Sequence, residues 1–243
     1  MKINTLIEVA GAPVQEIKKA LRLEHKTPGR GIITIKTDTA PAEGGPVQVT
    51  MQLGDNQPRI VMLAFIESAT PGQGGQWQIM VRELAGLLNR RISINLRSCT
   101  AQQILAAISE KTGAHFVLPD SEWTKQDLPR FQHIGGGYGA LDNLLRAFRV
   151  DGGTWQQQPD GRIYVGELEK SLVGGKAIEI EAGIFDDLSI SSGTLPAIPR
   201  LRPGTKISVG GKVRQIAAID ITDNTMRLHW VKSLHEEKLR GIQ

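Results

Sequence analysis

The amino-acid sequence predicts an α+β protein that is mainly β, in which two small β-barrel-like domains flank an α+β insert. Apolar and polar residues alternate in both end thirds of the chain, the spacing changes to a helical period in between, and 27 glycines and 12 prolines supply many turns. Alternation is typical of half-buried strands, whereas a 3.6-residue period is typical of helices. We therefore expect a first barrel at residues 1–85, an insert at 86–170, and a second barrel-like domain with a C-terminal tail at 171–243.

The first part, residues 1–85, is predicted to be a series of short strands. Apolar residues alternate with polar ones in residues 31–36, 47–54 and 76–81, so one face of each strand should be buried. Residues 59–66 are apolar on both faces, which predicts an interior strand. Residues 14–23 fit either a helix or a strand. Short strands at this spacing predict a small barrel or sandwich.

The insert begins with a strand-like segment at residues 92–96 and then a helix. Thr100 and Gln103 have the spacing of a capping box, which marks the start of a helix. Ile104 and its apolar neighbours form a stripe along one face of that helix, and Gly113 is placed to end it in the left-handed conformation.

A second copy of the same pattern follows. A shift of 40 positions places Ile104 on Leu144 and Gly113 on Gly153, so each copy is predicted to be a strand, a helix, a glycine stop and a strand. The second copy ends in a hairpin that turns at Pro159–Asp160–Gly161. Two copies are too few for a solenoid, so this repeat predicts a compact α+β module.

The third part returns to strand periodicity. Residues 176–181, 207–209, 213–221 and 226–231 alternate or are apolar between turn residues, and residues 239–243 look like a tail. This part also carries the excess of basic residues, which could meet nucleic acid or an acidic protein face. We favour a solvated or protein-contacting surface, because only Trp230 lies among these charges as a stacking platform. The basic residues are Arg200, Arg202, Lys206, Lys212, Arg214, Arg227 and Lys232.

Composition restricts the class of protein further. The formal net charge is +4, and the single cysteine, Cys99, cannot form an internal disulfide, which favours assembly in a reducing compartment. No apolar run approaches the roughly 18 residues of a membrane span. The N-terminal residues lack the continuous apolar core of a secretory signal, so export by that route is not expected.

The glycine-rich stretch FQHIGGGYGALDNLL, residues 131–145, resembles a loop that cradles phosphate. Gly135, Gly137 and Ala140 can be placed on a dinucleotide-binding spacing, but no acid-ended strand follows at the required distance. There is also no Gly-Lys-Ser/Thr of a P-loop. We therefore predict a tight strand-to-helix crossing that packs closely against a neighbour.

The remaining reactive residues do not form an active site. His229 and His235 are six positions apart, which does not fit a usual zinc spacing. His133 near Asp142 could form an acid–base pair, although a surface histidine or a hydrogen-bonded one is the better interpretation. Asp186 and Asp187 are expected on a turn with diverging carboxylates. Cys99 precedes a helix start, which can lower a thiol pKa, but a structural thiol is favoured. We predict no catalytic, cofactor-binding or metal-binding residues, and no enzyme.

Residues 51–118 resemble the central hub proteins of phage baseplates, a family that includes the late control gene D proteins and the N-terminal part of VgrG spikes. In that family a strand-rich tube domain ends in an Arg-Asp-Leu-like segment, here Arg82–Glu83–Leu84. A strand, a helix and a Lys-Thr-Gly stop follow, here Lys111–Thr112–Gly113. A second barrel-like tube domain then comes after the insert. No motif residue of this resemblance carries chemistry.

The resemblance implies a homotrimer in which two similar barrels per subunit form a pseudo-six-fold ring. Such a ring joins a hexameric tail tube or distal tail protein above to a trimeric spike or fibre below, contacts other baseplate proteins, and lines a channel through which DNA passes transiently. It implies a place in the virion tail, with assembly in the host cytoplasm. The α+β repeat also resembles the ring-forming domains of secretins, so a secretion-system assembly module is the alternative.

Overall fold

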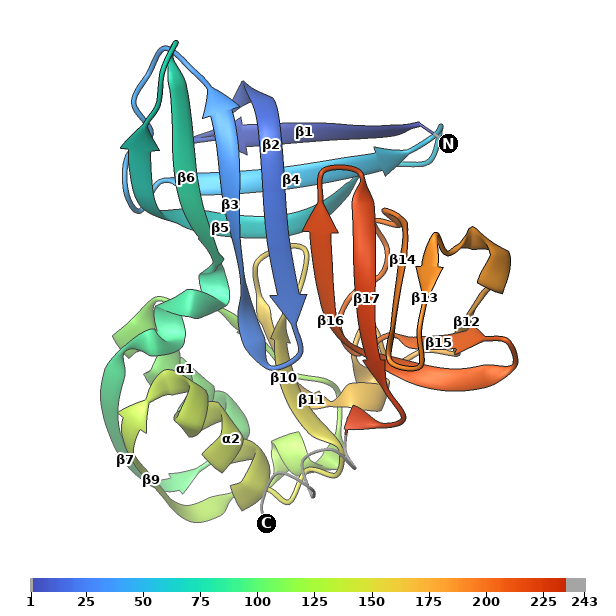
Figure 1. Ribbon diagram of the computed structural model, residues 1–243. Helices are drawn as coiled ribbons and strands as arrows, with labels where there is room; N and C mark the ends of the chain where they lie inside the picture. The colour runs from blue at the N-terminus through green and yellow to red at the C-terminus, as the bar shows by residue number, and fades with distance from the viewer. Residues whose placement is uncertain (1, 235–243) are drawn as a thin grey trace. The chain divides into compact units, whose positions relative to one another are not determined.

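The chain divides into two compact units. Met1–Glu83 and Lys176–Gln243 form one, which we call the β unit, and Leu84–Gly175 form the other, which we call the α+β unit. The structure is a computed structural model that describes residues 2–234 (Figure 1). Among these residues, no helix is both long enough and apolar enough to cross a membrane. The predicted tail at residues 239–243 lies outside the described residues.

The first half of the β unit is a closed six-stranded barrel. Its strands are β1 (Ile3–Val9), β2 (Ala12–Glu24), β3 (Thr27–Lys36), β4 (Pro46–Leu53), β5 (Arg59–Pro71) and β6 (Gln76–Glu83). They follow the order β1-β4-β5-β6-β3-β2, and β2 pairs again with β1 to close the ring. The ambiguous residues 14–23 lie within β2. There Leu21 and Leu23 are buried while Ala20 is exposed, so the period of two prevails over the helical spacing.

The second half of the β unit continues the sheet of the barrel. It contains β12 (Ile178–Ile180), β13 (Asp187–Leu188), β14 (Ser192–Pro196), β15 (Lys206–Val209), β16 (Lys212–Thr222) and β17 (Thr225–Val231). Strand β16 pairs antiparallel with β2, from Ala218 opposite Glu24 to Thr222 opposite Ala20, and these two strands run side by side in Figure 1. The sheet then continues through β17 and β14 to β13, while β15 pairs with β16 and β12.

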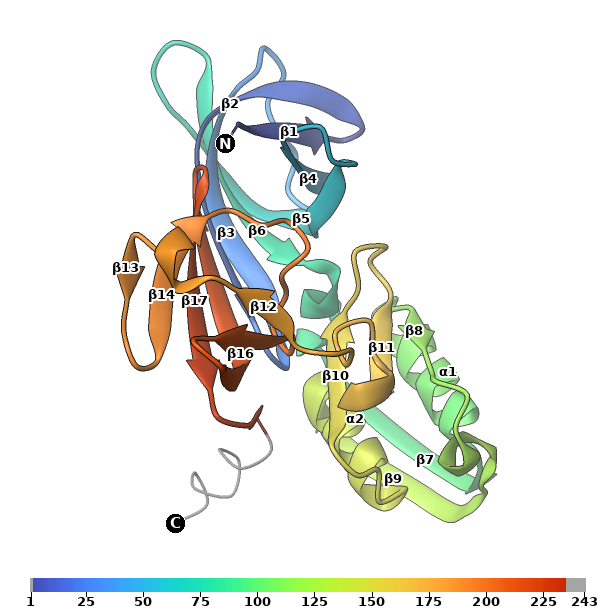
Figure 2. The ribbon, with the colours of Figure 1, turned by 90° about the vertical axis from the view of Figure 1, so that its right-hand side faces the viewer.

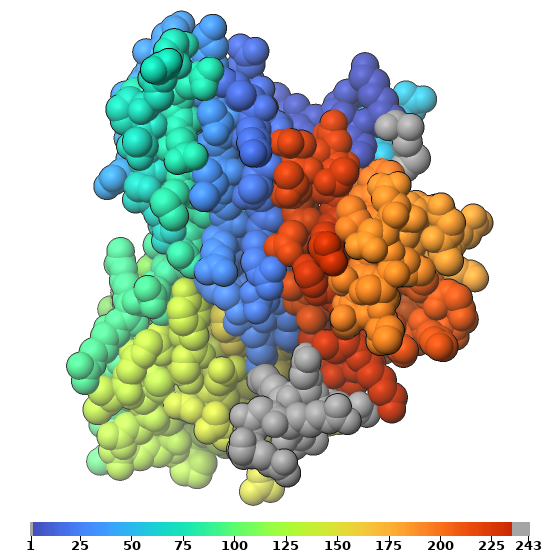
Figure 3. Space-filling view, in the orientation of Figure 1, coloured from blue at the N-terminus to red at the C-terminus, as the bar shows by residue number. Residues whose placement is uncertain are grey.

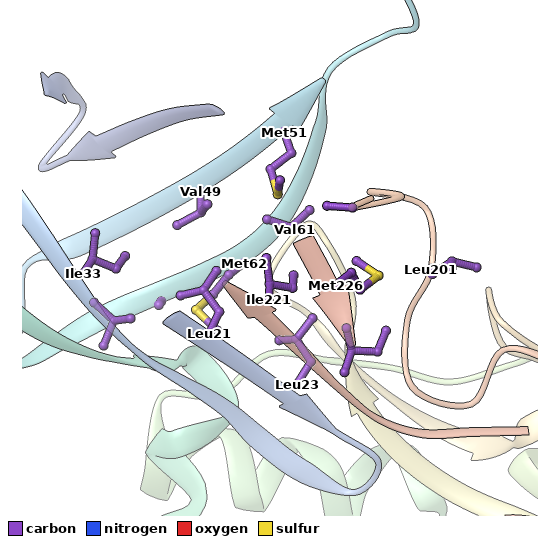
Figure 4. Close-up of a cluster of buried hydrophobic side chains, with 14 of the residues drawn as sticks. Leu21, Leu23, Ile33, Val49, Met51, Val61, Met62, Leu201, Ile221 and Met226 are labelled. Carbon is purple, nitrogen blue, oxygen red and sulfur yellow. The ribbon is translucent and has the colours of Figure 1, made fainter. Parts of the chain in front are cut away.

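One hydrophobic core serves both halves of the β unit. Leu21 and Leu23 of β2 lie close to Ile221 of β16 and Met226 of β17 (Figure 4). Leu201, in the loop after β14, belongs to the same cluster of buried side chains. Each fully buried side chain of this size contributes about 1.5–3 kcal/mol of transfer free energy. The core therefore joins segments that are separated by the whole α+β unit in the sequence.

The α+β unit combines a two-stranded ribbon, two helices and a small mixed sheet. The ribbon pairs β7 (Arg91–Cys99) antiparallel with β9 (Leu128–Gly136). Helices α1 (Ala101–Thr112) and α2 (Gly137–Ala147) pack on it (Figure 2). The mixed sheet has the order β10-β11-β8, with β8 at Phe116–Val117, β10 at Gly153–Gln157 and β11 at Ile163–Glu167. Short 3-10 helices lie at Leu84–Asn89 (η1), Glu122–Lys125 (η2) and Leu168–Lys170 (η3).

The predicted fold class is confirmed: the protein is mainly β, with a closed six-stranded barrel and few helices. The strand-helix-strand repeat is present, but the predicted register of about 40 is wrong. The first residues of the helices, Ala101 and Gly137, are 36 positions apart, and Arg149 (φ 52°) occupies the left-handed position that Gly113 (φ 78°) occupies in the first copy. The predicted shift of 40 differs from the observed shift of 36 by four residues, which is about one helical turn. Apolar residues therefore still fall on the same helix face, and the two apolar stripes match equally well at either shift. The predicted domain boundaries, after residue 85 and after residue 170, stay a prediction.

Candidate assembly surfaces

The glycine-rich stretch forms a tight crossing from β9 into α2. Strand β9 pairs antiparallel with β7, whereas a dinucleotide fingerprint requires a buried parallel strand at this point. The backbone N–H of Gly137 donates to the carbonyl of Arg90 at 3.2 Å, and a Cβ on Gly137 would lie 2.8 Å from the Leu88 carbonyl oxygen. The expectation of a glycine crossing packed closely against a neighbour is confirmed, and that neighbour is η1.

His133 is a structural histidine. Its Nε2 donates to the Gly136 carbonyl at 3.0 Å, because a carbonyl can only accept, and this leaves Nδ1 to accept from the Asn143 side-chain amide at 2.9 Å. The partner is therefore Asn143 rather than the neighbouring Asp142. The buried imidazole fixes the turn between β9 and α2, and the hydrogen-bonded reading of His133 is confirmed.

The other histidines and acids do not converge. His229 Nε2 lies 2.8 Å from Asp220 Oδ2 across β16 and β17, and His235 lies outside the described residues. Asp187 begins strand β13 rather than lying on a turn, and its carboxylate is 3.7 Å from Arg227 Nη2. Within residues 2–234, no three His, Cys, Asp or Glu side chains are grouped as a metal site.

Cys99 is part of the core of the α+β unit. Its side chain is buried at the end of β7, and burial raises the pKa of the thiol. A raised pKa disfavours the reactive thiolate, so the suggestion that the helix start lowers this pKa is wrong. The preferred reading of Cys99 as a structural thiol therefore agrees with its position.

The sheet of the β unit carries a row of arginines on its outer face. Arg22 of β2, Arg30 of β3 and Arg82 of β6 lie directly opposite one another on neighbouring strands, and Asp220 of β16 lies opposite Arg22. Arg22 Nη1 is 3.0 Å from Asp220 Oδ1, and Arg82 pairs with Glu67. In the described part of the chain, Arg30 has no ion-pair partner. We call this set the arginine row.

A shallow depression of about 540 Å³ runs beside the arginine row. The next cross-strand row contains Thr222, Ala20, Ile32 and Met80, of which Ile32 and Met80 are 44% and 47% exposed. The opposite face of the same strands forms the core. The sheet therefore has one dry face and one wet face that extends from β6 to β17.

A buried contact fixes the second half of the β unit onto the barrel. Arg202, in the loop after β14, donates through Nη2 to the carbonyls of Ile60 and Val61 at 3.1 Å each, and its Nη1 is 3.9 Å from Glu83 Oε1. Glu83 also accepts the backbone N–H of Gly29 at 2.7 Å. Burial raises the pKa of Glu83 and lowers that of Arg202. Because these two ionisable groups have little access to water, they form a buried structural ion pair and not a surface pair. We call this contact between Arg202 and Glu83 the Arg202–Glu83 joint.

Two of the seven basic residues predicted in the last third form ion pairs within the fold. Arg202 is buried against Glu83, and Arg227 contacts Asp187 and Ser192. Trp230 is buried and donates its indole N–H to the Ile190 carbonyl at 2.9 Å. The one candidate stacking platform in this region is thus part of the core.

A groove of about 1030 Å³ lies in the α+β unit between α1 and the edge strand β8. Its apolar walls come from Leu105 and Ala106 on the helix and from Phe116 on the strand. The charged side chains at its rim already have partners, since Arg162 pairs with Asp160 and Lys125 with Asp120. Among the described residues that line the groove, these charged side chains are therefore already neutralised by a neighbour.

No protein-family model matches the chain. One curated relative, a 58.7 kDa protein encoded in the region 3′ of the lys gene of Haemophilus phage HP1, is 25% identical over 226 residues. The match covers 89% of this chain and 40% of that protein. This chain therefore spans less than half the length of the phage relative.

Solved structures share the fold across almost the whole chain. The 43 kDa tail protein of prophage MuSo2 from Shewanella oneidensis superposes with a TM-score of 0.70 at 11% identity, covering 95% of this chain and 98% of that one. A tail protein from Neisseria meningitidis gives 0.68 at 11% identity, covering 95% and 96%. An Escherichia coli component of the type VI secretion system, described as similar to the phage T4 tail proteins gp27 and gp5, gives 0.61 at 13% identity, covering 93% and 76%.

The fold therefore defines a class: this chain has the architecture of phage tail proteins and of related type VI secretion components. The most similar of these structures are tail proteins rather than enzymes, which agrees with the prediction of a structural protein.

Proposed function

We propose that this protein is a trimeric central hub of a phage or phage-like tail baseplate. It joins a hexameric tail tube or distal tail protein to a trimeric spike or fibre, and it assembles in the host cytoplasm. The observation that carries this proposal is the continuous sheet of the β unit, which presents two β parts per chain. Three copies of such a chain supply six similar β parts, which resolves the mismatch between a six-fold tube and a three-fold spike.

We further propose that the wet face of this sheet, with the arginine row, lines the channel. A channel that conducts DNA needs a hydrated wall, and the arginine row with Thr222 and Thr34 is polar along several neighbouring strands. The ion pairs of Arg22 and Arg82 reduce the net positive charge of this wall. A wall with weak net charge limits tight binding of phosphates during passage.

The first experiment measures oligomeric state. Light scattering of the purified chain should give about three times the 26.5 kDa of one chain, and electron microscopy should show rings.

A cysteine introduced at Thr34, on the wet face, should be labelled by a small reagent but not by a bulky one once the ring has formed. A chain that stays monomeric at every concentration, alone and with its tail-tube partner, contradicts the proposal.

A secretion-system assembly module is the second candidate. The type VI secretion component that superposes with a TM-score of 0.61 favours it. The two candidates differ in the proteins encoded beside this chain and in which tube protein it binds. A pull-down with the neighbouring phage tail-tube protein should succeed for a hub, whereas binding only to a secretion tube protein supports the second candidate.

A further inference from the structure

An acidic and apolar segment lies exposed at the edge of the β unit. Residues 178–190, which we call the acidic edge, contain β12, the short helix η4 (Ala182–Ile184) and β13, and they carry no basic residue. Its acids are Glu179, Glu181, Asp186 and Asp187. Ile184, Leu188 and Ile190 are 44%, 45% and 94% exposed, and Figure 3 shows the orange atoms of this part at the surface.

The acidic edge is held in place rather than loose. The Phe185 ring meets Trp230 edge-on with centroids 6.0 Å apart, and the Asp186 N–H donates to the Thr194 carbonyl at 2.9 Å. Strand β13 ends the sheet, so its outer side offers unpaired backbone groups. An ordered, apolar sheet edge of this kind is suited to pairing with another chain.

The α+β unit carries a surface of opposite charge. The outer face of the β7–β9 ribbon presents exposed side chains, while its inner face packs on both helices (Figure 2). We call this face, together with the preceding Arg90, the basic ribbon. Its members are Arg90, Arg91, Ser93, Asn95, Arg97, Arg130, Gln132 and Ile134.

The basic ribbon has no internal neutralisation. Among residues 2–234, none forms an ion pair with Arg90, Arg91, Arg97 or Arg130, and the outer face of the two strands has no acid. Arg97 lies directly opposite Arg130, and like charges opposite each other destabilise a strand pair. Arg130 donates only to the Asn95 side chain, at 3.2 Å. An anionic partner would offset this repulsion.

We infer that the acidic edge of one copy docks on the basic ribbon of a second copy. Asp187 already pairs with Arg227, but the other three acids form no ion pair within residues 2–234 and can meet the four unpaired arginines. Ile190 can pack on Ile134, which is 64% exposed. The two surfaces differ, so the contact is heterologous and generates a ring when the rotation closes. The inference rests on the proposed homo-oligomer and names the surfaces through which its copies meet. A protein partner is favoured over single-stranded nucleic acid, because the basic ribbon has no aromatic side chain for base stacking.

The test is charge reversal with charge-swap rescue in the full chain. The variant Arg97→Glu/Arg130→Glu should weaken association by about tenfold or more, because acids then face acids. Adding Glu181→Arg and Asp186→Arg to the same chain should restore association to within a few-fold of the wild type. Lys36→Glu/Arg59→Glu is the matched control, since it makes the same change in net charge at exposed strand residues of the barrel that belong to neither surface. Melting curves establish that each variant is folded.

The outcomes separate this inference from the proposed function. A trimeric wild type whose assembly is unaffected by Arg97→Glu/Arg130→Glu overturns the inference and leaves the hub intact. A loss of assembly that the swapped charges do not restore also overturns the inference. If that variant instead loses DNA binding while it remains trimeric, the ribbon is a nucleic-acid surface and the inference is wrong. A monomeric wild type contradicts both proposals.

Discussion

Gly137 is a residue of the glycine-rich stretch whose lack of a side chain is required by close packing. Its Cα faces the backbone of Leu88 so closely that a Cβ would lie 2.8 Å from the carbonyl oxygen and 3.1 Å from the Cα. Gly139, two positions further along α2, would place a Cβ at 3.4 Å from the His133 ring, which is an ordinary contact. The two glycines of one helix therefore have different reasons for being there.

We predict that Gly137→Ala lowers the free energy of unfolding by about 1–3 kcal/mol, because the clash involves backbone that cannot rotate away. Gly139→Ala is the control and should be neutral or stabilise by up to about 1 kcal/mol, because alanine favours helix. Urea denaturation measures both. Equal effects of the two substitutions would show that close approach is not the reason for Gly137.

The Arg202–Glu83 joint predicts a large effect from a single truncation. Arg202→Ala leaves the buried Glu83 carboxylate without its cation and frees two carbonyls, so unfolding should become easier by about 3–5 kcal/mol. The double variant Glu83→Gln/Arg202→Met should lose less, because it leaves no unpaired charge. Arg162→Ala, at an exposed ion pair, serves as control and should cost under about 1 kcal/mol. If Arg202→Ala lowers the free energy of unfolding no more than Arg162→Ala does, the contact between Arg202 and Glu83 does not stabilise the fold as proposed.

Glu83 also predicts how stability depends on pH. Its pKa in the folded chain is raised above 4.5, its ordinary value, so the folded state binds more protons than the unfolded state just above that pH. The free energy of unfolding that Glu83 contributes therefore falls as pH rises from about 4.5 through the raised pKa. Denaturation of the wild type and Glu83→Gln across this window should show a falling difference between them. If the difference in unfolding free energy between the wild type and Glu83→Gln instead rises with pH, the pKa of Glu83 is lowered in the folded state and this prediction is wrong.

At the scale of elements, helix α1 is stabilised at its start and α2 is not. The Thr100 hydroxyl accepts the Gln103 N–H at 3.3 Å, and the Gln103 side chain accepts the Thr100 N–H at 2.9 Å, so the predicted capping box is confirmed. Gly136, the residue before α2, has no side chain that could cap this helix. The second helix depends instead on its packing against η1 and the ribbon.

We predict that Thr100→Ala costs about 1 kcal/mol of stability, because it removes the acceptor of the capping box. Thr100→Ser keeps the hydroxyl and should cost much less, so it is the matched control. Thermal unfolding followed by far-ultraviolet circular dichroism measures both. If Ser and Ala have the same effect at this position, the hydroxyl is not acting as a cap.

The positions of many strands and of helix α1 could be predicted from the local sequence, but which strands pair with each other could not. The period of two found the strands around Val49 and Ile79, and the capping box found α1. The same patterns contain no information on which strand pairs with β2, because β16 lies about 200 positions away. For the same reason the sequence missed the Glu83–Arg202 joint and the basic ribbon. Their residues lie far apart in the chain and meet only through tertiary pairing.

The whole molecule consists of two units with separate cores. The core of the α+β unit is made from its own residues, including Leu88, Ile104, Leu141 and Trp155. The core of the β unit draws on both the first 83 residues and the last part of the chain. This difference predicts how fragments behave.

We predict that residues 84–175, expressed alone, fold and unfold cooperatively, whereas residues 1–83 alone do not form a stable barrel. The isolated barrel would expose Leu21, Leu23 and the carbonyls that Arg202 binds. Dispersed amide resonances and a sigmoidal denaturation curve are expected only for the first fragment. A cooperative transition for residues 1–83 would show that the barrel does not need β16 and β17.

The shared strand β2 also has a consequence for synthesis on the ribosome. Its first residues pair with β1, while Ala20–Glu24 pair with β16, which emerges almost 200 residues later. At about 5–20 residues per second, this half of β2 waits roughly 10–40 s for its partner. During that time the nascent barrel presents an open edge beside Leu21 and Leu23 while the α+β unit is being made. Assembly with other copies before β16 arrives would therefore occur through this open edge and not through the surfaces of the finished sheet.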